Sequence, residues 1–219
     1  AEVDESTGTF VVRQQEQRLR VQHLSPRKRT YTQNNDRPFP LKTKRFCRVT
    51  EAFPQHHHIR VTTTEKRRHE RILAVMDAFQ EQGGPVLSDL ERLEAGDALG
   101  VRFRAGNGIE TVLFRSHAGG ERSSVSLAGI ESDARVTSIR CRDDGHTDQW
   151  LLHSGSRLAV AGDSLFSANV ACDVALVPGP GGGQIWITNG SAVKARFRLA
   201  QRPGTLFSSP PNRPDQATP

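Results

Sequence analysis

The sequence predicts an all-β fold of stacked antiparallel sheets, a β-sandwich or supersandwich with at most one or two short helices. Three observations lead to this prediction. Short segments rich in Val, Ile, Leu, Thr and Phe recur along the chain, several of them alternate polar and apolar residues, and turn-forming residues separate them. Many short strands spaced in this way are typical of antiparallel sandwiches.

In the first half of the chain, most of the apolar segments read as strands. Residues 70–79 fit a helix by composition and a buried strand by their apolar run. Residues 87–97 predict a short helix, because Ser88 can cap it and Glu91 follows three residues later, as in a capping box. The predicted strands are residues 9–14, 17–24, 45–50, 57–64, 98–105 and 109–115.

In the second half, the same alternation continues up to the C-terminal tail. The predicted strands are residues 134–141, 149–155, 157–162, 168–177, 184–189 and 192–200. We expect four aromatic residues of these and the preceding strands to be core, namely Phe103, Trp150, Trp186 and Phe197. The stretch PGPGGG at 178–183 lacks the GK[ST] ending of a phosphate loop, so it is predicted to be a hairpin loop.

We expect residues 1–201 to form a single all-β sandwich domain. Residues 202–219 are rich in Pro and Ser and are predicted to be a disordered tail. The chain opens at Ala1 on what reads as a turn entering a strand, so we expect a processed or excised fragment. No apolar run approaches membrane-spanning length, and no membrane partner is expected.

The positive charge is concentrated near the N-terminus. The 219 residues carry a net charge of +6, yet residues 10–72 contain 16 Lys/Arg against 5 Asp/Glu, or +11, and the remainder carries −5. Such an asymmetry favours an anionic partner, although a solvated polar face is the alternative. A weak polyanion site is predicted at Arg27, Lys28, Arg29, Arg60, Lys66, Arg67 and Arg68. Aromatic residues do not interleave with these cations, and no nucleic-acid partner is expected.

Three consecutive histidines precede the predicted strand at 57–64. On a strand His56 and His58 share a face, where two imidazoles at i and i+2 can reach one metal ion. A third ligand would have to come from elsewhere, such as His23, His153 or Asp148. Because Arg60 on the same face would repel a cation, His56 and His58 are weak metal candidates, and solvated side chains are the alternative.

The sequence offers no recognisable catalytic motif. Cys47, Cys141 and Cys172 lack CxxC spacing, and their disulfide state is left open. The Ser–His pairs in SHAGG (116–120) and LHSGS (152–156) are too common to indicate catalysis, and there is no GxSxG elbow. Tyr31 stands in a Pro/Asn-rich stretch that reads as a loop. We therefore assign no catalytic residue.

The order of the segments resembles a known family. RLRVQHLSPR (18–27) has the form L-x-V-x-x-L-x-P, and Gly155 to Gly162 has the form G-x-x-L-x-x-x-G. With HHIRVTTTEKRRHERILAVMDAF (57–79) between them, these segments resemble the C-terminal β-sandwich of heparinase II/III-like polysaccharide lyases, the group that includes oligoalginate lyases.

The resemblance implies a module of an enzyme that cleaves an anionic, uronate-containing polysaccharide by β-elimination. In that family an N-terminal α/α-toroid supplies much of the active site, so a toroid domain and the polysaccharide are the expected partners. The isolated chain is expected to be inactive, and a periplasmic or secreted location is favoured. We expect no cofactor, and a structural zinc or calcium ion, as in some relatives, is the alternative. The alternative function is a non-catalytic carbohydrate-binding or structural β-sandwich module.

Overall fold

A computed structural model of the chain describes residues 2–34, 58–66, 68, 70–116, 123–179, 182–188 and 193–198. Among these residues the strands pair in antiparallel fashion, and the one helical element is a single 3-10 turn, η2 (Glu81–Gly83). The prediction of an all-β antiparallel fold is therefore confirmed. The chain divides into two compact units, Ala1–Val86 and Leu87–Pro219, which are described separately. The single domain over residues 1–201 stays a prediction.

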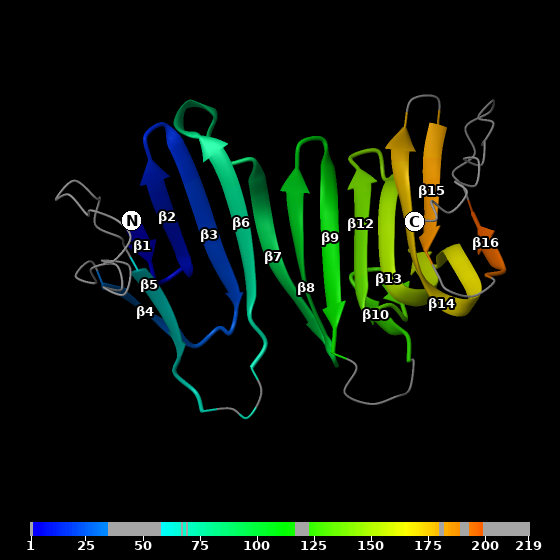
Figure 1. The fold of residues 1–219 in the computed structure, drawn as a ribbon, viewed down its shortest axis with the longest axis horizontal. Coiled ribbons are helices and arrows are strands. Elements are labelled where there is room, and N and C mark those ends of the chain that lie inside the picture. Colours follow the sequence, from blue (N-terminus) through cyan, green and yellow to red (C-terminus); the bar gives the residue numbers. More distant parts are fainter. Residues whose placement is uncertain are drawn as a thin grey trace, which may run out of the picture. The chain divides into compact units, whose positions relative to one another are not determined.

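The N-terminal unit is built on a four-stranded sheet in the order β1-β2-β3-β6 (Figure 1). Its strands are β1 (Glu2–Asp4), β2 (Thr9–Gln14), β3 (Gln17–Ser25) and β6 (Leu73–Gln80). Residues 70–79, which fitted both helix and strand, thus contribute the inner strand β6. Val21 and Leu73 are buried on this sheet, as the alternation of the segments predicts.

A two-stranded ribbon, β4 (Arg29–Asn34) with β5 (His58–Thr63), packs on this sheet. Tyr31 makes the junction, because its ring lies 5.7 Å from the ring of His23 on β3 and its hydroxyl donates to the carbonyl oxygen of Gly8 at 3.0 Å. The prediction that Tyr31 lies in a loop is wrong. The alternation in RTYTQ is that of a half-buried strand.

A buried carboxylate fixes the end of β6. Asp77 is buried, and its Oδ2 accepts hydrogen bonds from Arg20 Nη2 at 2.9 Å and from the backbone N–H of Val86 at 3.1 Å. A buried carboxylate needs such partners, since leaving it unpaired costs several kcal/mol. Asp77 therefore ties the segment after β6 back to the sheet.

The C-terminal unit contains ten strands of one continuous sheet. They are β7 (Leu87–Ala95), β8 (Ala98–Ala105), β9 (Gly108–Arg115), β10 (Val125–Leu127), β11 (Ile130–Ser132), β12 (Val136–Arg142), β13 (Thr147–Val160), β14 (Asp163–Gly179), β15 (Gly182–Thr188) and β16 (Ala195–Phe197). The principal order is β10-β11-β13-β12-β9-β8-β7, and β14 pairs with β13, β15 and β16. The predicted hairpin loop at 178–183 lies partly outside the described residues, and its four described residues are paired, Pro178 with Gly183 and Gly179 with Gly182, at the ends of β14 and β15.

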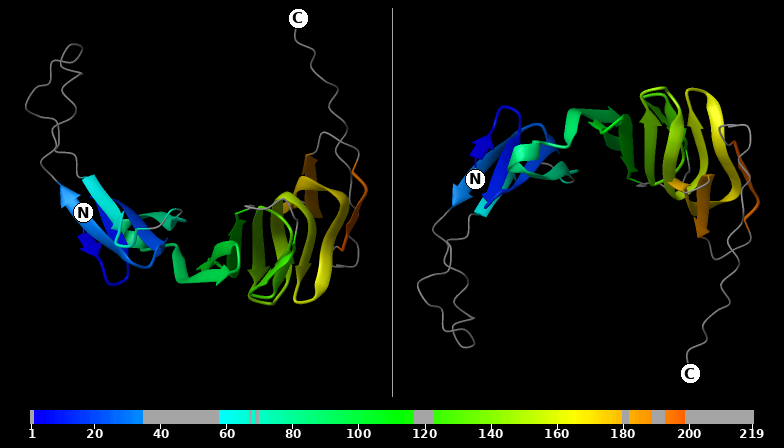
Figure 2. Two further views of the ribbon diagram at one scale, coloured as in Figure 1. Left: turned by 90° about the horizontal axis from the view of Figure 1, so that it is seen from below. Right: turned by 90° about the horizontal axis from the view of Figure 1, so that it is seen from above.

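The long strands β13 and β14 turn a corner that converts this sheet into a sandwich. The first part of β13 pairs with β12 and its last part with β11, while the pairing of β13 with β14 shifts register around Gly155. Figure 2 shows the strong curvature of these strands. Strands that pass from one layer to the other through bulges are a known way to close a two-layer β-core.

The motif of Gly155, Leu158 and Gly162 has a physical reason at this corner. A Cβ atom at Gly155 would lie 2.5 Å from the Cβ of Ala134, so only glycine allows the β11–β12 connection to cross β13 here. Leu158 is buried in the core, and Gly162 adopts a φ of +86° in the β13–β14 hairpin. These three residues therefore serve the fold.

The core between the two layers is aromatic. The ring of Trp150 on β13 lies 5.7 Å from that of Phe166 and 6.3 Å from that of Phe197, and the two phenyl rings are 5.3 Å apart. Trp150 is thus core, as predicted, whereas Phe103 and Phe197 are only partly buried. The prediction for Trp186 is wrong, because its side chain is 58% exposed on the strand β15.

The predicted helix at residues 87–97 is also wrong, since this segment is strand β7 and the turn after it. The pairing of β7 with β8 shifts between Ser88 and Glu91, where an extra residue enters β7. The bulge places Leu87 and Leu90 on one face although they are three residues apart. The predicted strand at 45–50 and the tail at 202–219 lie outside the described residues.

Candidate polyanion-binding site

The β4–β5 ribbon brings together two basic clusters that are far apart in the sequence. Arg29 pairs with Thr63 in the ribbon, and just beyond this pair the backbone N–H of Thr64 donates to the carbonyl oxygen of Lys28 at 3.3 Å. The residues before β4 therefore lie at the same end of the ribbon as those after β5. We call this the basic ribbon end; its described members are Arg27, Lys28, Lys66 and Arg68.

Arg29 points inward from this cluster. Its Nε donates to the hydroxyl of Tyr31 at 2.7 Å, its Nη1 donates to the carbonyl oxygen of Pro26, and its guanidinium lies 5.9 Å from the centre of the Tyr31 ring. These contacts hold the ribbon against the sheet. Arg29 thus supports the fold of the ribbon, and its role as a polyanion contact stays a prediction.

Lys28 is compensated locally by an acid. Its Nζ lies 2.6 Å from Glu65 Oε1, and the lysine side chain is 74% exposed. Exposed pairs of this kind contribute little to stability and exchange readily with other partners. Arg27, Lys66 and Arg68 are also exposed, so the basic ribbon end presents cations to solvent.

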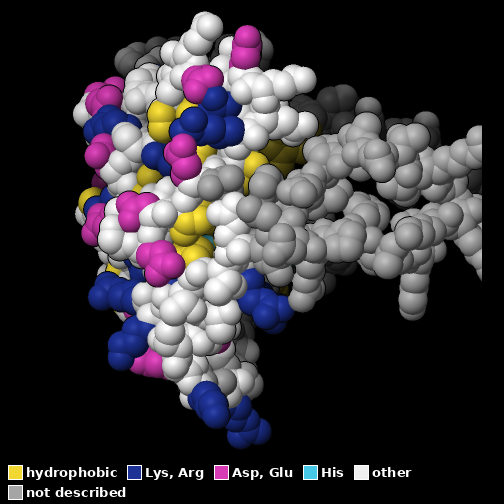
Figure 3. Space-filling view, turned by 90° about the vertical axis from the view of Figure 1, so that its left-hand side faces the viewer, with side chains coloured by type: hydrophobic (Ala, Val, Ile, Leu, Met, Phe, Trp, Pro, Cys, Tyr) yellow, Lys and Arg dark blue, Asp and Glu magenta, His cyan; other side chains and the backbone are white. Residues whose placement is uncertain are grey.

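Arg60 lies on the outward face of the same ribbon, opposite Thr32. It precedes Thr64 by four residues, which corresponds to about 13 Å of strand. In Figure 3, which views the molecule from the side of β4 and β5, Lys and Arg side chains are interleaved with Asp and Glu. The cations therefore form separate groups along the surface. Arg67 lies outside the described residues.

His23 forms part of the support beneath the ribbon. Its ring contacts those of Phe10 and Tyr31, at 5.8 and 5.7 Å, and burial together with the nearby Arg29 cation lowers its pKa. Its Nδ1 is buried without a hydrogen-bond partner among the described residues. A neutral His23 fits this environment, because a charged imidazole would face both desolvation and a like charge.

The proposed metal ligands cannot be assembled from the described residues. His56 lies outside them, and the side chain of His58 is not described. Within the part of the chain that the structure describes, no group of three or more His, Cys, Asp or Glu side chains could hold a metal ion. Two of the suggested third ligands have other partners: Asp148 accepts from Arg142 Nε at 2.7 Å, and His153 Nδ1 lies 2.9 Å from Asp173 Oδ1.

Two of the three cysteines lie within the described residues. Cys141 and Cys172 are free thiols, and Cys47 lies outside the described residues. Burial, with the nearby carboxylates of Asp173 and Asp133, raises the pKa of the Cys172 thiol. A raised pKa disfavours the thiolate, which is the reactive form.

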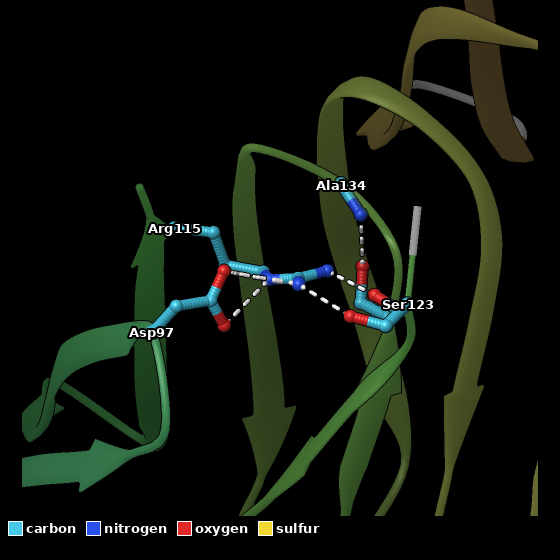
Figure 4. Close-up of polar contacts among 5 residues, drawn as sticks. Asp97, Arg115, Ser123 and Ala134 are labelled. Carbon is cyan, nitrogen blue, oxygen red and sulfur yellow. Dashed lines mark hydrogen bonds and ion pairs between the residues drawn. The ribbon is translucent and has the colours of Figure 1, made fainter. Parts of the chain in front are cut away.

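Several polar clusters in the C-terminal unit that the sequence did not reveal are structural. Figure 4 shows Arg115 bound to Asp97 in the β7–β8 turn, with Nη2 at 3.1 Å from Oδ2, and also to Ser123 ahead of β10. The carboxylate of Asp133 accepts from the N–H and Oγ of Ser156, at 2.8 and 2.5 Å, and from the N–H of Arg157 at 2.8 Å. Each cluster joins backbone segments and leaves no evident nucleophile–base pair.

Comparisons with known proteins add no identification. Neither the protein-family models nor the curated proteins include a match to this chain. Within the described residues, no helix has the length and apolar character required to cross a membrane.

Proposed function

We propose that the chain is the C-terminal β-sheet module of a heparinase II/III-like polysaccharide lyase. It binds an anionic, uronate-containing polysaccharide through the basic ribbon end and does not carry a complete active site. The observation that carries this proposal is the meeting of two sequence-distant basic clusters at one end of the β4–β5 ribbon. Clustered exposed cations attract polyanions and raise their local concentration.

The spacing of the cations favours a polymer over a small anion. Arg60 and the basic ribbon end are separated by about 13 Å of strand, and each of these contacts is worth only about 0.2–1 kcal/mol because it is exposed. Several weak contacts add up on a chain of repeating charges. A single phosphate or sulfate ion would engage one group only.

The family assignment is supported by the residues that carry the resemblance. Within L-x-V-x-x-L-x-P, Val21 is buried on β3 and Pro26 is buried where the chain turns toward the ribbon. Within G-x-x-L-x-x-x-G, each named residue is required by the β13–β14 corner. Residues fixed by packing in this way are those a shared fold would retain.

The test is binding and turnover of the purified chain with heparin, heparan sulfate, alginate and chondroitin sulfate. The proposal predicts salt-sensitive binding to at least one of them and no ultraviolet signal from unsaturated uronate products. Binding that is insensitive to salt would contradict the polyanion site. Product formation would mean that a complete active site lies within these residues.

A further inference from the structure

The outward face of the C-terminal sheet is defined by the strand pairing. Ile139, Trp150 and Val174 point into the core. Because successive side chains of a strand alternate between faces, their neighbours in sequence on β12, β13 and β14 point outward. The residues of β9 and β15 that pair with those neighbours lie on the same face.

The central row of this face is apolar. It runs across five strands, with Val112 opposite Ser138, then Leu151, Ala175 and Trp186 each opposite the residue before it. Leu151 is 41% exposed and Trp186 is 58% exposed. The small side chain of Ala175 stands between them, so the indole of Trp186 is not covered by its neighbour across the strand.

The neighbouring row of outward residues, which includes Val136 at the start of β12, adds aromatic and polar groups. Phe114, which is 43% exposed, stands opposite Val136, which in turn stands opposite His153. His153 Nδ1 lies 2.9 Å from Asp173 Oδ1, and Asp173 pairs with Thr188 at the outer strand. An imidazole, a carboxylate and a hydroxyl therefore border the apolar row.

The row on the other side carries amides and a pair of opposite charges. Arg140 stands between Glu110 and Gln149, and Gln184 stands opposite Val177. The charges of the two side rows are thus placed beside opposite charges or hydrogen-bonding groups. Over residues 87–219 as a whole, 14 Lys/Arg balance 14 Asp/Glu.

We propose that this outward face, with Trp186 as its main contact, binds the sugar rings of an uncharged stretch of polysaccharide. A sugar ring presents an apolar C–H face and a rim of hydroxyls. An exposed indole in an apolar row, flanked by amide, imidazole, carboxylate and hydroxyl groups, matches both features.

The charge distribution argues against a polyanion. A polyanion would need cations in excess, and the charged residues named on this face are one cation, Arg140, and two carboxylates, Glu110 and Asp173. Glu110, Arg140 and Asp173 stand beside the apolar row, and the rim of a protein interface is polar as well, so association with a second copy is measured as an outcome of the test below. The saccharide class rests on the proposed function, but this surface belongs to the other unit and is tested independently.

Trp186 provides the reporter for the test. The chain has two tryptophans, and Trp150 is 2% exposed, so acrylamide quenches chiefly Trp186. The full chain is titrated with cellohexaose and with a desulfated, carboxyl-reduced heparin octasaccharide. Working in about 1 M sodium chloride limits charge interactions to roughly 3 Å. We expect at least one of these glycans to protect Trp186 from quenching.

Variants then locate the contact. Trp186→Ala should weaken binding by roughly tenfold or more by calorimetry, as truncation of a central aromatic contact does. Ile187→Ala is the matched control, because Ile187 is the next residue of β15, is 42% exposed and points to the opposite face. The control should retain the affinity of the unmodified chain.

Two results would overturn this proposal. One is the absence of protection and of measurable heat with both glycans. The other is self-association in sedimentation velocity that Trp186→Ala abolishes, without glycan binding, which would assign the face to a second copy. Replacing Arg27, Lys66 and Arg68 by Ala should leave neutral glycan binding unchanged. Failure at Trp186 is thereby separated from failure of the polyanion site.

Discussion

The two units of the chain are stabilised by different kinds of contact. Among the described residues, the N-terminal unit buries few apolar side chains, Val21, Tyr31 and Leu73, and relies on hydrogen bonds around Tyr31 and Asp77. The C-terminal unit has a continuous core centred on Trp150 and Phe166.

The units also differ in charge. Residues 1–86 contain 16 Lys/Arg against 10 Asp/Glu, a net charge of +6, whereas residues 87–219 are neutral. The whole net charge of the chain thus lies in the unit with the smaller core. Net positive charge and the larger of the two described cores thus belong to different units of the chain.

The largest effect is expected from the core of the C-terminal unit. Phe166→Ala should lower the free energy of unfolding by about 3–5 kcal/mol, because Phe166 is 1% exposed and its removal leaves a cavity. Denaturant unfolding followed by Trp150 fluorescence measures this unit. Trp186→Ala is the control and should change stability by less than about 0.5 kcal/mol. Equal losses for the two variants would contradict the assignment of core and surface.

A smaller loss is expected where β13 crosses the β11–β12 connection. Gly155→Ala should cost about 1–3 kcal/mol, because the added Cβ meets Ala134 within a well-packed corner. Gly83→Ala serves as the control, since nothing lies within 4 Å of a Cβ there. Thermal unfolding of both variants gives the comparison, and an unchanged midpoint for Gly155→Ala would argue against the close approach.

The hydrogen bonds of Tyr31 beneath the β4–β5 ribbon should contribute less to stability than the aromatic core of the C-terminal unit. Tyr31→Phe removes the hydroxyl that joins Arg29 to Gly8, which should destabilise the ribbon by about 1–2 kcal/mol. Amide hydrogen exchange of β4 and β5 should accelerate, with little change in β12 and β13. Exchange that is unchanged in β4 would show that the hydroxyl does not hold the ribbon.

The smallest effect concerns pH and His23. Because burial and Arg29 lower the pKa of His23 below its ordinary 6.5, the unfolded chain takes up this proton first as the pH falls. The contribution of His23 is therefore complete above pH 6.5 and is lost as the pH falls below that value. His23→Gln should flatten this part of the stability profile of the N-terminal unit, followed by hydrogen exchange of β3. An unaltered profile would contradict the buried, neutral imidazole.

Alternation in the sequence predicts most of the fold, because it reports directly which side chains face the core. β2 and β8 match their predicted ranges, and most other predicted strands are found with shifted ends. The prediction of two strands at 149–155 and 157–162 is wrong, because the single long strand β13 (Thr147–Val160) runs through both. The errors have local causes. The bulge in β7 places apolar residues that are three positions apart on one face, which is also the spacing of a helix. Trp186 belongs to an apolar strand, but its side chain lies on the exposed face of that strand. The alternation in RTYTQ was masked by the Pro and Asn residues that follow it.

The candidate site could be predicted only in part. Composition identifies the basic clusters, but their meeting depends on the pairing of Arg29 with Thr63 across a long sequence separation, which local patterns do not specify. Likewise, the sequence cannot reveal that Arg29 turns inward to Tyr31 while Arg27 stays exposed. Pairing register and side-chain direction decide both points.

Polyanion binding at the basic ribbon end is tested most directly by the salt dependence of heparin binding in two triple variants. Arg27→Ala, Lys66→Ala and Arg68→Ala together remove three of the four exposed cations of the basic ribbon end and leave Lys28, which is paired with Glu65. Arg157→Ala, Lys194→Ala and Arg196→Ala remove three exposed cations of the C-terminal unit. With about 0.2–1 kcal/mol per contact, the first variant should bind roughly 3- to 150-fold more weakly, with a shallower salt dependence, and the second should match the unmodified chain. Equal losses in the two variants would contradict a polyanion site on the ribbon.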